Sequence, residues 1–89
     1  MIAQQLQIQS DKLIYRYSKK FDILDVYFID KVKAISDEIS DGVYEHFDIE
    51  TDNFVGVSIE DYKKRNKEYL QNILPIKLSF EYIEKNIIN

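Results

Sequence analysis

The residues of this sequence with the clearest chemical potential are a dense run of carboxylates around one histidine. From Ser36 to Asp61 the chain carries nine Asp and Glu residues and no Lys or Arg, whereas the remainder carries seven acids and all twelve bases. Such a charge block is typical of a surface that meets a cationic partner. The residues that we expect to contact that partner are Asp37, Glu38, Asp41, Tyr44, Glu45, Asp48, Glu50 and Asp52.

The single histidine, His46, is a candidate general base or metal ligand. However, a zinc site needs three or four His, Cys or carboxylate ligands in a defined set, and this chain has no cysteine and no second histidine. We therefore expect His46 to be a surface residue of a strand. Adjacent acids such as Asp37 and Glu38, or Glu60 and Asp61, point to opposite faces of a strand and do not share a pocket.

The pattern Asp48-x-Glu50-x-Asp52 is similar to the first half of a calcium-binding loop. Asn53 replaces the glycine of the sharp turn, and the twelfth position is Ile59 instead of the bidentate Glu. A solvated turn is the simpler interpretation. With no acid-base pair, nucleophile triad or ligand set in the sequence, we expect a non-enzymatic protein with no cofactor and no metal.

These acids must be positioned by a β-hairpin. Two β-rich runs, Val43–Ile49 and Phe54–Ile59, flank the polar residues 50–53, whose Asp and Asn tolerate the positive φ of a tight turn. Two alternating runs precede the hairpin, at residues 12–18 and 23–29, and their short connection predicts an antiparallel pair. Residues 31–40 could form one more short strand.

A change to helical spacing follows the hairpin. Apolar residues recur at the period of an amphipathic helix from about 60 to 73, and Pro75 predicts that this helix ends at or before Leu74. Ser79 could cap a final short helix, although Ile76 and Leu78 also alternate like a strand. For residues 1–10 the sequence leaves two alternatives open: an unanchored terminus, which is the commoner outcome, and an extension of the first strand through Leu6 and Ile8.

The sequence thus predicts one α+β domain over residues 1–89. Its core is an antiparallel four- or five-stranded β-meander, covered by the helix after the last hairpin and followed by a short C-terminal element over 76–89. Zero cysteines, no export signal and no apolar run that could span a bilayer predict a soluble cytoplasmic protein without a membrane partner.

Residues 12–65 resemble a family of small prokaryotic proteins known as domain of unknown function 2283. The resemblance is carried by YSKKFDILDVYF and DEISDGVYEHFDIETDNFVGVSIED, above all by Asp22, Asp41-Gly42, Asp48, Glu50-Thr51 and Val55-Gly56. Ser18, Asp25 and Asp52 depart from the family pattern. The resemblance implies the predicted fold but no catalytic residues, and it implies a masking role because some members look like the smaller partner of toxin-antitoxin pairs.

We therefore expect an interaction module that binds and masks a basic protein through the acidic hairpin, in the manner of an antitoxin. One alternative is a phage-type inhibitor that mimics nucleic acid against a nuclease or defence complex. Another is an uncharacterised small homo-oligomer, a homodimer formed through sheet edges or through a face that carries several of the seven tyrosines. Net charge −4 disfavours direct nucleic-acid binding, despite the basic residues Lys63, Lys64, Arg65 and Lys67.

Overall fold

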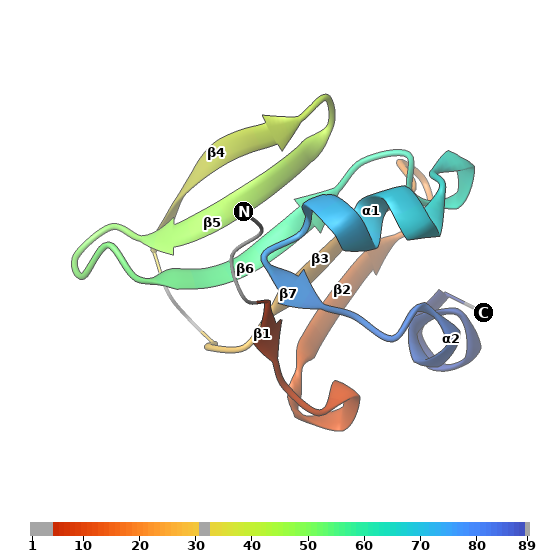
Figure 1. Cartoon of the computed structure of the whole chain (residues 1–89), viewed down its shortest axis with the longest axis horizontal. Coiled ribbons are helices and arrows are strands. Elements are labelled where there is room, and N and C mark those ends of the chain that lie inside the picture. Colours follow the sequence, from red (N-terminus) through yellow and green to blue (C-terminus); the bar gives the residue numbers. More distant parts are fainter. Residues whose placement is uncertain (1–4, 31–32, 89) are drawn as a thin grey trace.

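The computed structural model describes residues 5–30 and 33–88 and has an α+β fold based on a five-stranded antiparallel sheet (Figure 1). The strands are β2 (Ile14–Ser18), β3 (Ile23–Tyr27), β4 (Ala34–Ser40), β5 (Val43–Asp48) and β6 (Phe54–Ile59). Their spatial order is β2-β3-β6-β5-β4, so β4 to β6 form a meander that returns beside β3. The predicted fold class is confirmed, and the predicted hairpin of Val43–Ile49 with Phe54–Ile59 is the pair β5–β6. The third strand proposed within 31–40 is β4, and residues 31 and 32 lie outside the described part.

One face of the sheet is apolar because alternate residues of its central strands are Leu, Val and Ile. Leu24 and Val26 of β3 pair with Ile59 and Val57 of β6, and all four are fully or almost fully buried. The helices and the short strands near the chain ends lie in front of this face in Figure 1. The other face carries no helix in the described part of the chain.

The helix predicted over residues 60–73 begins later than expected. Residues 62–64 form a 3₁₀ turn, η2 (Tyr62–Lys64), and the α-helix α1 spans Lys67–Ile73. Asp61 has a left-handed φ of 53°, and Asn66 caps α1 by accepting a hydrogen bond from the Tyr69 amide at 2.8 Å. These two residues break the helix because a left-handed residue and an extended N-cap cannot continue helical hydrogen bonding.

The C-terminal segment packs on the same core. The helix α1 ends before Pro75 as predicted, and Ser79 caps α2 (Phe80–Ile83) by accepting a hydrogen bond from the Tyr82 amide at 3.2 Å. The chain then continues as a π-helical turn, η3 (Glu84–Ile88). Ile83 and Ile88 are buried in the same hydrophobic cluster as the central strands. The short C-terminal helix is thus confirmed.

From residue 5 on, the N-terminal segment is anchored, which decides against the unanchored terminus that the sequence favoured without excluding a strand. Strand β1 (Leu6–Gln7) pairs in parallel with β7 (Ile76–Lys77), and the Leu6 amide donates to the Pro75 carbonyl at 2.9 Å. A 3₁₀ turn, η1 (Ser10–Lys12), then leads into β2. Two residues of pairing carry no periodicity, which is why the sequence pattern missed them; residues 1–4 lie outside the described part. No helix among residues 5–30 and 33–88 has the length and apolar character to cross a membrane.

Candidate functional site

All the residues predicted to contact a partner lie on one arm of the sheet. Asp37 and Glu38 are on β4, Asp41 is in the turn, and the others are on β5 or in the loop before β6. Much of this hairpin extends to the upper left of Figure 1 without a helix in front of it. The structure therefore gathers the predicted residues into one feature, from here on called the acidic hairpin: β4, β5 and the loop before β6 (residues 34–53). It shares only β5 with the hairpin predicted over residues 43–59.

Carboxylates occupy both faces of the acidic hairpin. Asp37 of β4 lies directly opposite Glu45 of β5, and Glu38 lies opposite Tyr44 on the other face. Partial burial raises the pKa of Glu45, and the charge of Asp37 raises it further. The pKa of Tyr44 is also raised, chiefly by the negative charge of Glu60 and then by burial and Glu38. Neighbouring carboxylates thus contribute to both pKa shifts, as the first cause for Tyr44 and after burial for Glu45.

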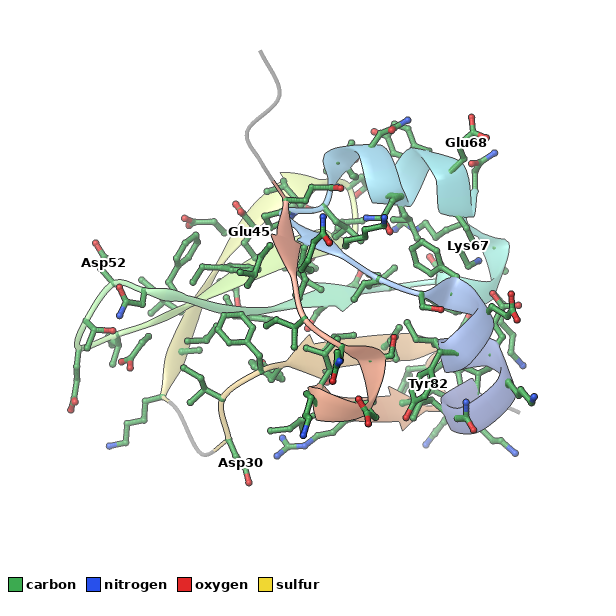
Figure 2. All side chains as sticks on the ribbon, turned by 60° about the horizontal axis from the view of Figure 1, so that its bottom comes forward. Asp30, Glu45, Asp52, Lys67, Glu68 and Tyr82 are labelled. Carbon is green, nitrogen blue, oxygen red and sulfur yellow. The ribbon has the colours of Figure 1, made fainter. Side chains whose placement is uncertain are left out.

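None of the basic residues that the structure describes forms a salt bridge with these carboxylates. Among the described residues the ion pair that forms joins Arg16 and Asp30, 3.9 Å apart and outside the hairpin. Lys67 donates hydrogen bonds to the backbone carbonyls of Tyr62 and Arg65 at 2.8 and 2.9 Å. Figure 2 shows Lys67 at the opposite end of the molecule from Asp52.

One basic side chain does approach the hairpin. Arg65 lies against Gly42 in the β4–β5 turn, and its Nε donates to the Glu60 carbonyl at 2.8 Å. At the other end of β4, the backbone carbonyl of Lys33 accepts a hydrogen bond from Ile49. The ion pair of the described residues leaves out the carboxylates of β4 and of the loop with Glu50 and Asp52. Glu38 Oε2 accepts a hydrogen bond from the Gly42 amide at 3.1 Å.

Strand β4 is an open edge of the sheet. Its residues from Ala34 to Glu38 are all exposed. The Ile49 amide donates to the Lys33 carbonyl, and in an antiparallel pair hydrogen-bonded and non-hydrogen-bonded positions alternate. Ser36 opposite His46 is therefore a non-hydrogen-bonded position, and its backbone N–H and C=O point away from β5. By the same alternation, the backbone N–H and C=O groups of Ala34 and Glu38 also point away from β5, toward the open edge.

A chain of polar side chains crosses the helix-free face of the sheet. Ser58 of β6 donates to Asp25 Oδ1 of β3 and lies 2.6 Å from His46 Nε2 of β5, whose Nδ1 lies 2.7 Å from Ser36 Oγ of β4. Four neighbouring strands are thus joined by side chains. His46 and Ser58 are each only 8% exposed, so the expectation of a surface histidine is wrong.

The ring of Tyr27 covers this chain because position 56 is glycine. Tyr27 is paired with Gly56, and its ring stacks on the His46 imidazole with centroids 5.1 Å apart and an interplanar angle of 20°. A Cβ at Gly56 would lie 2.7 Å from Tyr27 Cδ1 and would also clash with the Val26 carbonyl. The glycine therefore lets an aromatic ring cross from one strand to the next.

Sequence reasoning found the histidine but not its partners. Ser36, Ser58 and Asp25 are separated from one another by many residues, and only the strand order brings them into one row. The detectable signal was the alternation of the hairpin strands, which places Tyr44 and His46 on the face opposite Val43.

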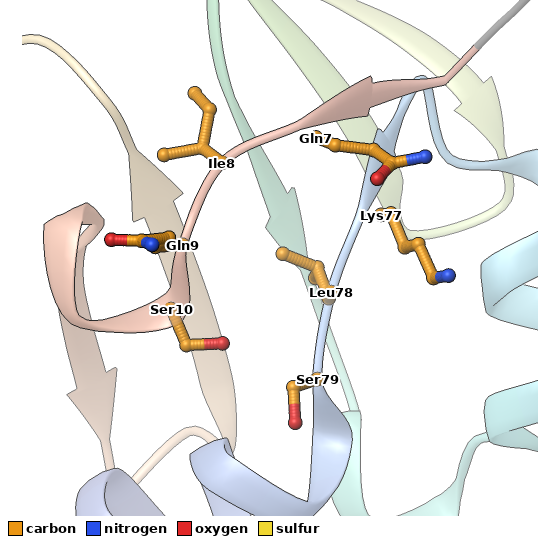
Figure 3. A pocket seen from close by; sticks show the side chains of 7 residues that line it. All are labelled: Gln7, Ile8, Gln9, Ser10, Lys77, Leu78 and Ser79. Carbon is orange, nitrogen blue, oxygen red and sulfur yellow. The ribbon is translucent and has the colours of Figure 1, made fainter.

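A separate cavity of about 600 Å³ lies where β1 and β7 diverge (Figure 3). Leu78 points into it, and the hydroxyls of Ser10 and Ser79 lie on its two sides. Its one ionisable lining residue is Lys77. The cavity therefore holds neither an acid-base pair nor any residue of the acidic hairpin.

Comparison with protein-family models, curated proteins and solved structures gave no match. The resemblance to domain of unknown function 2283 stays a prediction. Within residues 5–30 and 33–88 no three His, Asp or Glu side chains are grouped in a way that could hold a metal ion. In the region similar to a calcium loop, Asp48 Oδ1 instead accepts a hydrogen bond from the Glu50 amide at 2.9 Å.

Proposed function

We propose that this protein is a non-enzymatic interaction module that masks a basic protein partner, as an antitoxin masks its toxin. The observation that carries the proposal is the exposed edge strand β4 with its acids Asp37 and Glu38. An open strand edge offers backbone donors and acceptors to an added strand. Carboxylates beside that edge favour a cationic strand over a neutral one.

The acids on the two faces of β4 would select an added strand in which basic side chains also alternate between the two faces. Asp37 lies on the helix-bearing face and Glu38 on the opposite face, because successive side chains alternate. A Lys or Arg opposite each acid would then alternate in the partner too. Ile35, 46% exposed, offers one apolar contact beside Asp37. The partner we infer is therefore an extended basic segment with an apolar residue next to its cations.

Self-association through β4 is disfavoured by the same charges. Pairing of two β4 strands would bring Asp37 and Glu38 of one copy close to the same residues of the other. Like charges directly opposite each other destabilise a strand pair. A different, basic chain fits the edge better than a second copy, so a homodimer, if formed, would use another surface.

Co-expression with the product of the adjacent gene tests the proposal. The expected result is a complex that survives purification at low salt and weakens steeply as salt rises, because exposed ion pairs are screened. In the double variant D37N/E38Q, we expect affinity to fall by about tenfold or more, for a loss of roughly 1 kcal/mol per charge pair.

The matched control is E68Q/E81Q, which removes two exposed acids from α1 and α2 and leaves β4 intact. We expect this control to bind like the parent protein. Equal affinity of the two double variants, or a complex insensitive to salt, would refute a role for the acidic edge.

A further inference from the structure

The polar chain on the helix-free face has a single consistent direction of proton donation. A carboxylate can only accept, so Ser58 donates its hydroxyl proton to Asp25. The Ser58 oxygen then accepts from His46 Nε2–H across 2.6 Å. In the neutral imidazole the other nitrogen, Nδ1, carries a lone pair. Ser36 therefore donates its hydroxyl proton to His46 Nδ1 across 2.7 Å.

Burial favours the neutral form of His46, which is the form that can act as a base. Burial lowers its pKa, and the charge of Asp25 offsets only part of that effect. The ring is held between the two serines and under Tyr27, so its Nδ1 stays directed at Ser36. An imidazole fixed by a second hydrogen bond and aimed at a hydroxyl is the arrangement that activates serine nucleophiles.

Ser36 itself is accessible to a reagent. It is exposed on the edge strand, while the histidine behind it is buried. Its own backbone N–H points to the open side of β4, as the strand alternation requires. In serine hydrolases the N–H of the nucleophile is one of the donors to the developing oxyanion. Ser36 thus has a base, a positioned hydroxyl and one such donor.

We propose that Ser36 is a covalent modification site that accepts one acyl group per chain from an activated ester. The Ser36 oxygen attacks the ester carbonyl, and its proton passes to His46 Nδ1. The bond from the carbonyl carbon to the leaving oxygen then breaks, and that oxygen takes the proton from His46. The products are acyl-Ser36 and the free alcohol or phenol. Ser58 and Asp25 act as positioning residues through His46.

The acyl donor is expected to be unselective. Ser36 lies on an exposed stretch of the edge strand, and the cavity at β1 and β7 is not at this position. We therefore expect stoichiometric acylation and slow release, which is compatible with a non-enzymatic role. The assay uses the isolated protein, so its result is independent of the proposed partner.

The test is treatment of the whole protein with p-nitrophenyl acetate, followed by peptide mapping. General-base assistance is worth about a hundredfold or more, so Ser36 should be acetylated about a hundred times faster than Ser40 of the same strand. Ser40 faces Tyr69 instead of an imidazole. Hydroxylamine should remove the acetyl group from Ser36, as it does from esters but not from lysine amides.

Two variants separate activation from simple exposure. H46Q should reduce acetylation of Ser36 to the rate of Ser40. In D25N, removal of the charge that raises the His46 pKa should move the pH profile of acetylation to lower pH and slow the plateau rate. S40A is the matched control and should leave Ser36 unaffected. Equal rates at Ser36 and Ser40 in the parent protein, or an unchanged rate in folded H46Q, would overturn the proposal.

Discussion

At the scale of single residues, the helix-free face depends on a glycine that admits an aromatic ring. Tyr27 lies across Gly56 and stacks on His46, which removes the imidazole from water although no helix covers it. The buried nitrogens of that ring are satisfied by the two serines. A polar group can therefore be buried on an open sheet face when its neighbours supply both the cover and the hydrogen bonds.

Gly56→Ala should destabilise the protein by about 1–3 kcal/mol, because the added methyl group clashes with the Val26 carbonyl and the Tyr27 ring. Urea unfolding of the parent and the variant measures the loss. The double variant with Tyr27→Ala should lose less than the sum of the two single changes, since part of the clash has gone. Strict additivity would show that the ring does not contact position 56.

The stability of the protein should fall as the solution is acidified below about pH 6.5, the ordinary pKa of histidine. His46 has a lowered pKa in the folded state, so the unfolded chain binds a proton that the folded chain resists. Its contribution is therefore complete above the unfolded pKa and is lost as pH falls toward the folded value.

The groups packed around His46 are Asp25 and Tyr27 on β3, Ser58 on β6 and Ser36 on β4. Of these groups Asp25 is an acid, and its attraction for the protonated imidazole reduces the lowering of the His46 pKa. Unfolding free energies of the parent and H46Q, compared from about pH 8 to about pH 5, isolate the contribution of histidine. Identical pH dependence in both proteins would contradict it.

At the scale of elements, strands β2, β3, β5 and β6 follow directly from alternation, whereas β4 was less regular in sequence and helix boundaries depend on single residues. The period of the segment after β6 indicated one helix, but Asp61 and Asn66 divide it into η2 and α1. Either Asp61 or Asn66 could stand at the start of a helix. Tertiary contacts therefore decide where α1 begins. Arg65, extended between them, donates its Nε hydrogen bond back to Glu60.

Asn66→Ala should cost about 1 kcal/mol of stability, because the Tyr69 amide at the start of α1 loses its acceptor. Asn66→Asp is the matched control, since a carboxylate retains the acceptor and suits the positive end of the helix. Thermal unfolding of both variants is the measurement. A loss in the Asp variant equal to that in the Ala variant would mean that the cap does not hold α1.

Local patterns predicted most of the strands, the end of α1 before Pro75 and the cap at Ser79, because each of these features depends on neighbours in sequence. They missed the pairing of β1 with β7 and the row from Asp25 to Ser36, because both join residues far apart in the chain. The candidate site was therefore predictable as an acidic hairpin but not as a row of hydrogen-bonded side chains.

At the scale of the whole molecule, the last residues complete the hydrophobic core. Ile83 and Leu70 are fully buried against strands that were formed by residues 13–59. Without this cover, the apolar face of the sheet would be open to water. The segment 76–88 is thus part of the same domain.

Ile83→Ala should destabilise the protein by about 2–5 kcal/mol, the usual loss when a fully buried Ile is truncated. Ile49→Ala is the matched control, because Ile49 is 58% exposed and its truncation should change stability by less than about 0.5 kcal/mol. Denaturant midpoints of the two variants provide the comparison. Similar midpoints would show that the C-terminal helix is not anchored in the core.

The parallel pairing of β1 with β7 has a consequence for the protein during translation. Residues 6 and 7 leave the ribosome well before their partners, residues 76 and 77, and such long-range contacts form late. Until the C-terminal segment has been made, the apolar face of the nascent sheet is exposed to water. Chaperones commonly bind proteins in this state. Slow codons or a stall after residue 60 would therefore prolong the most aggregation-prone stage of biosynthesis.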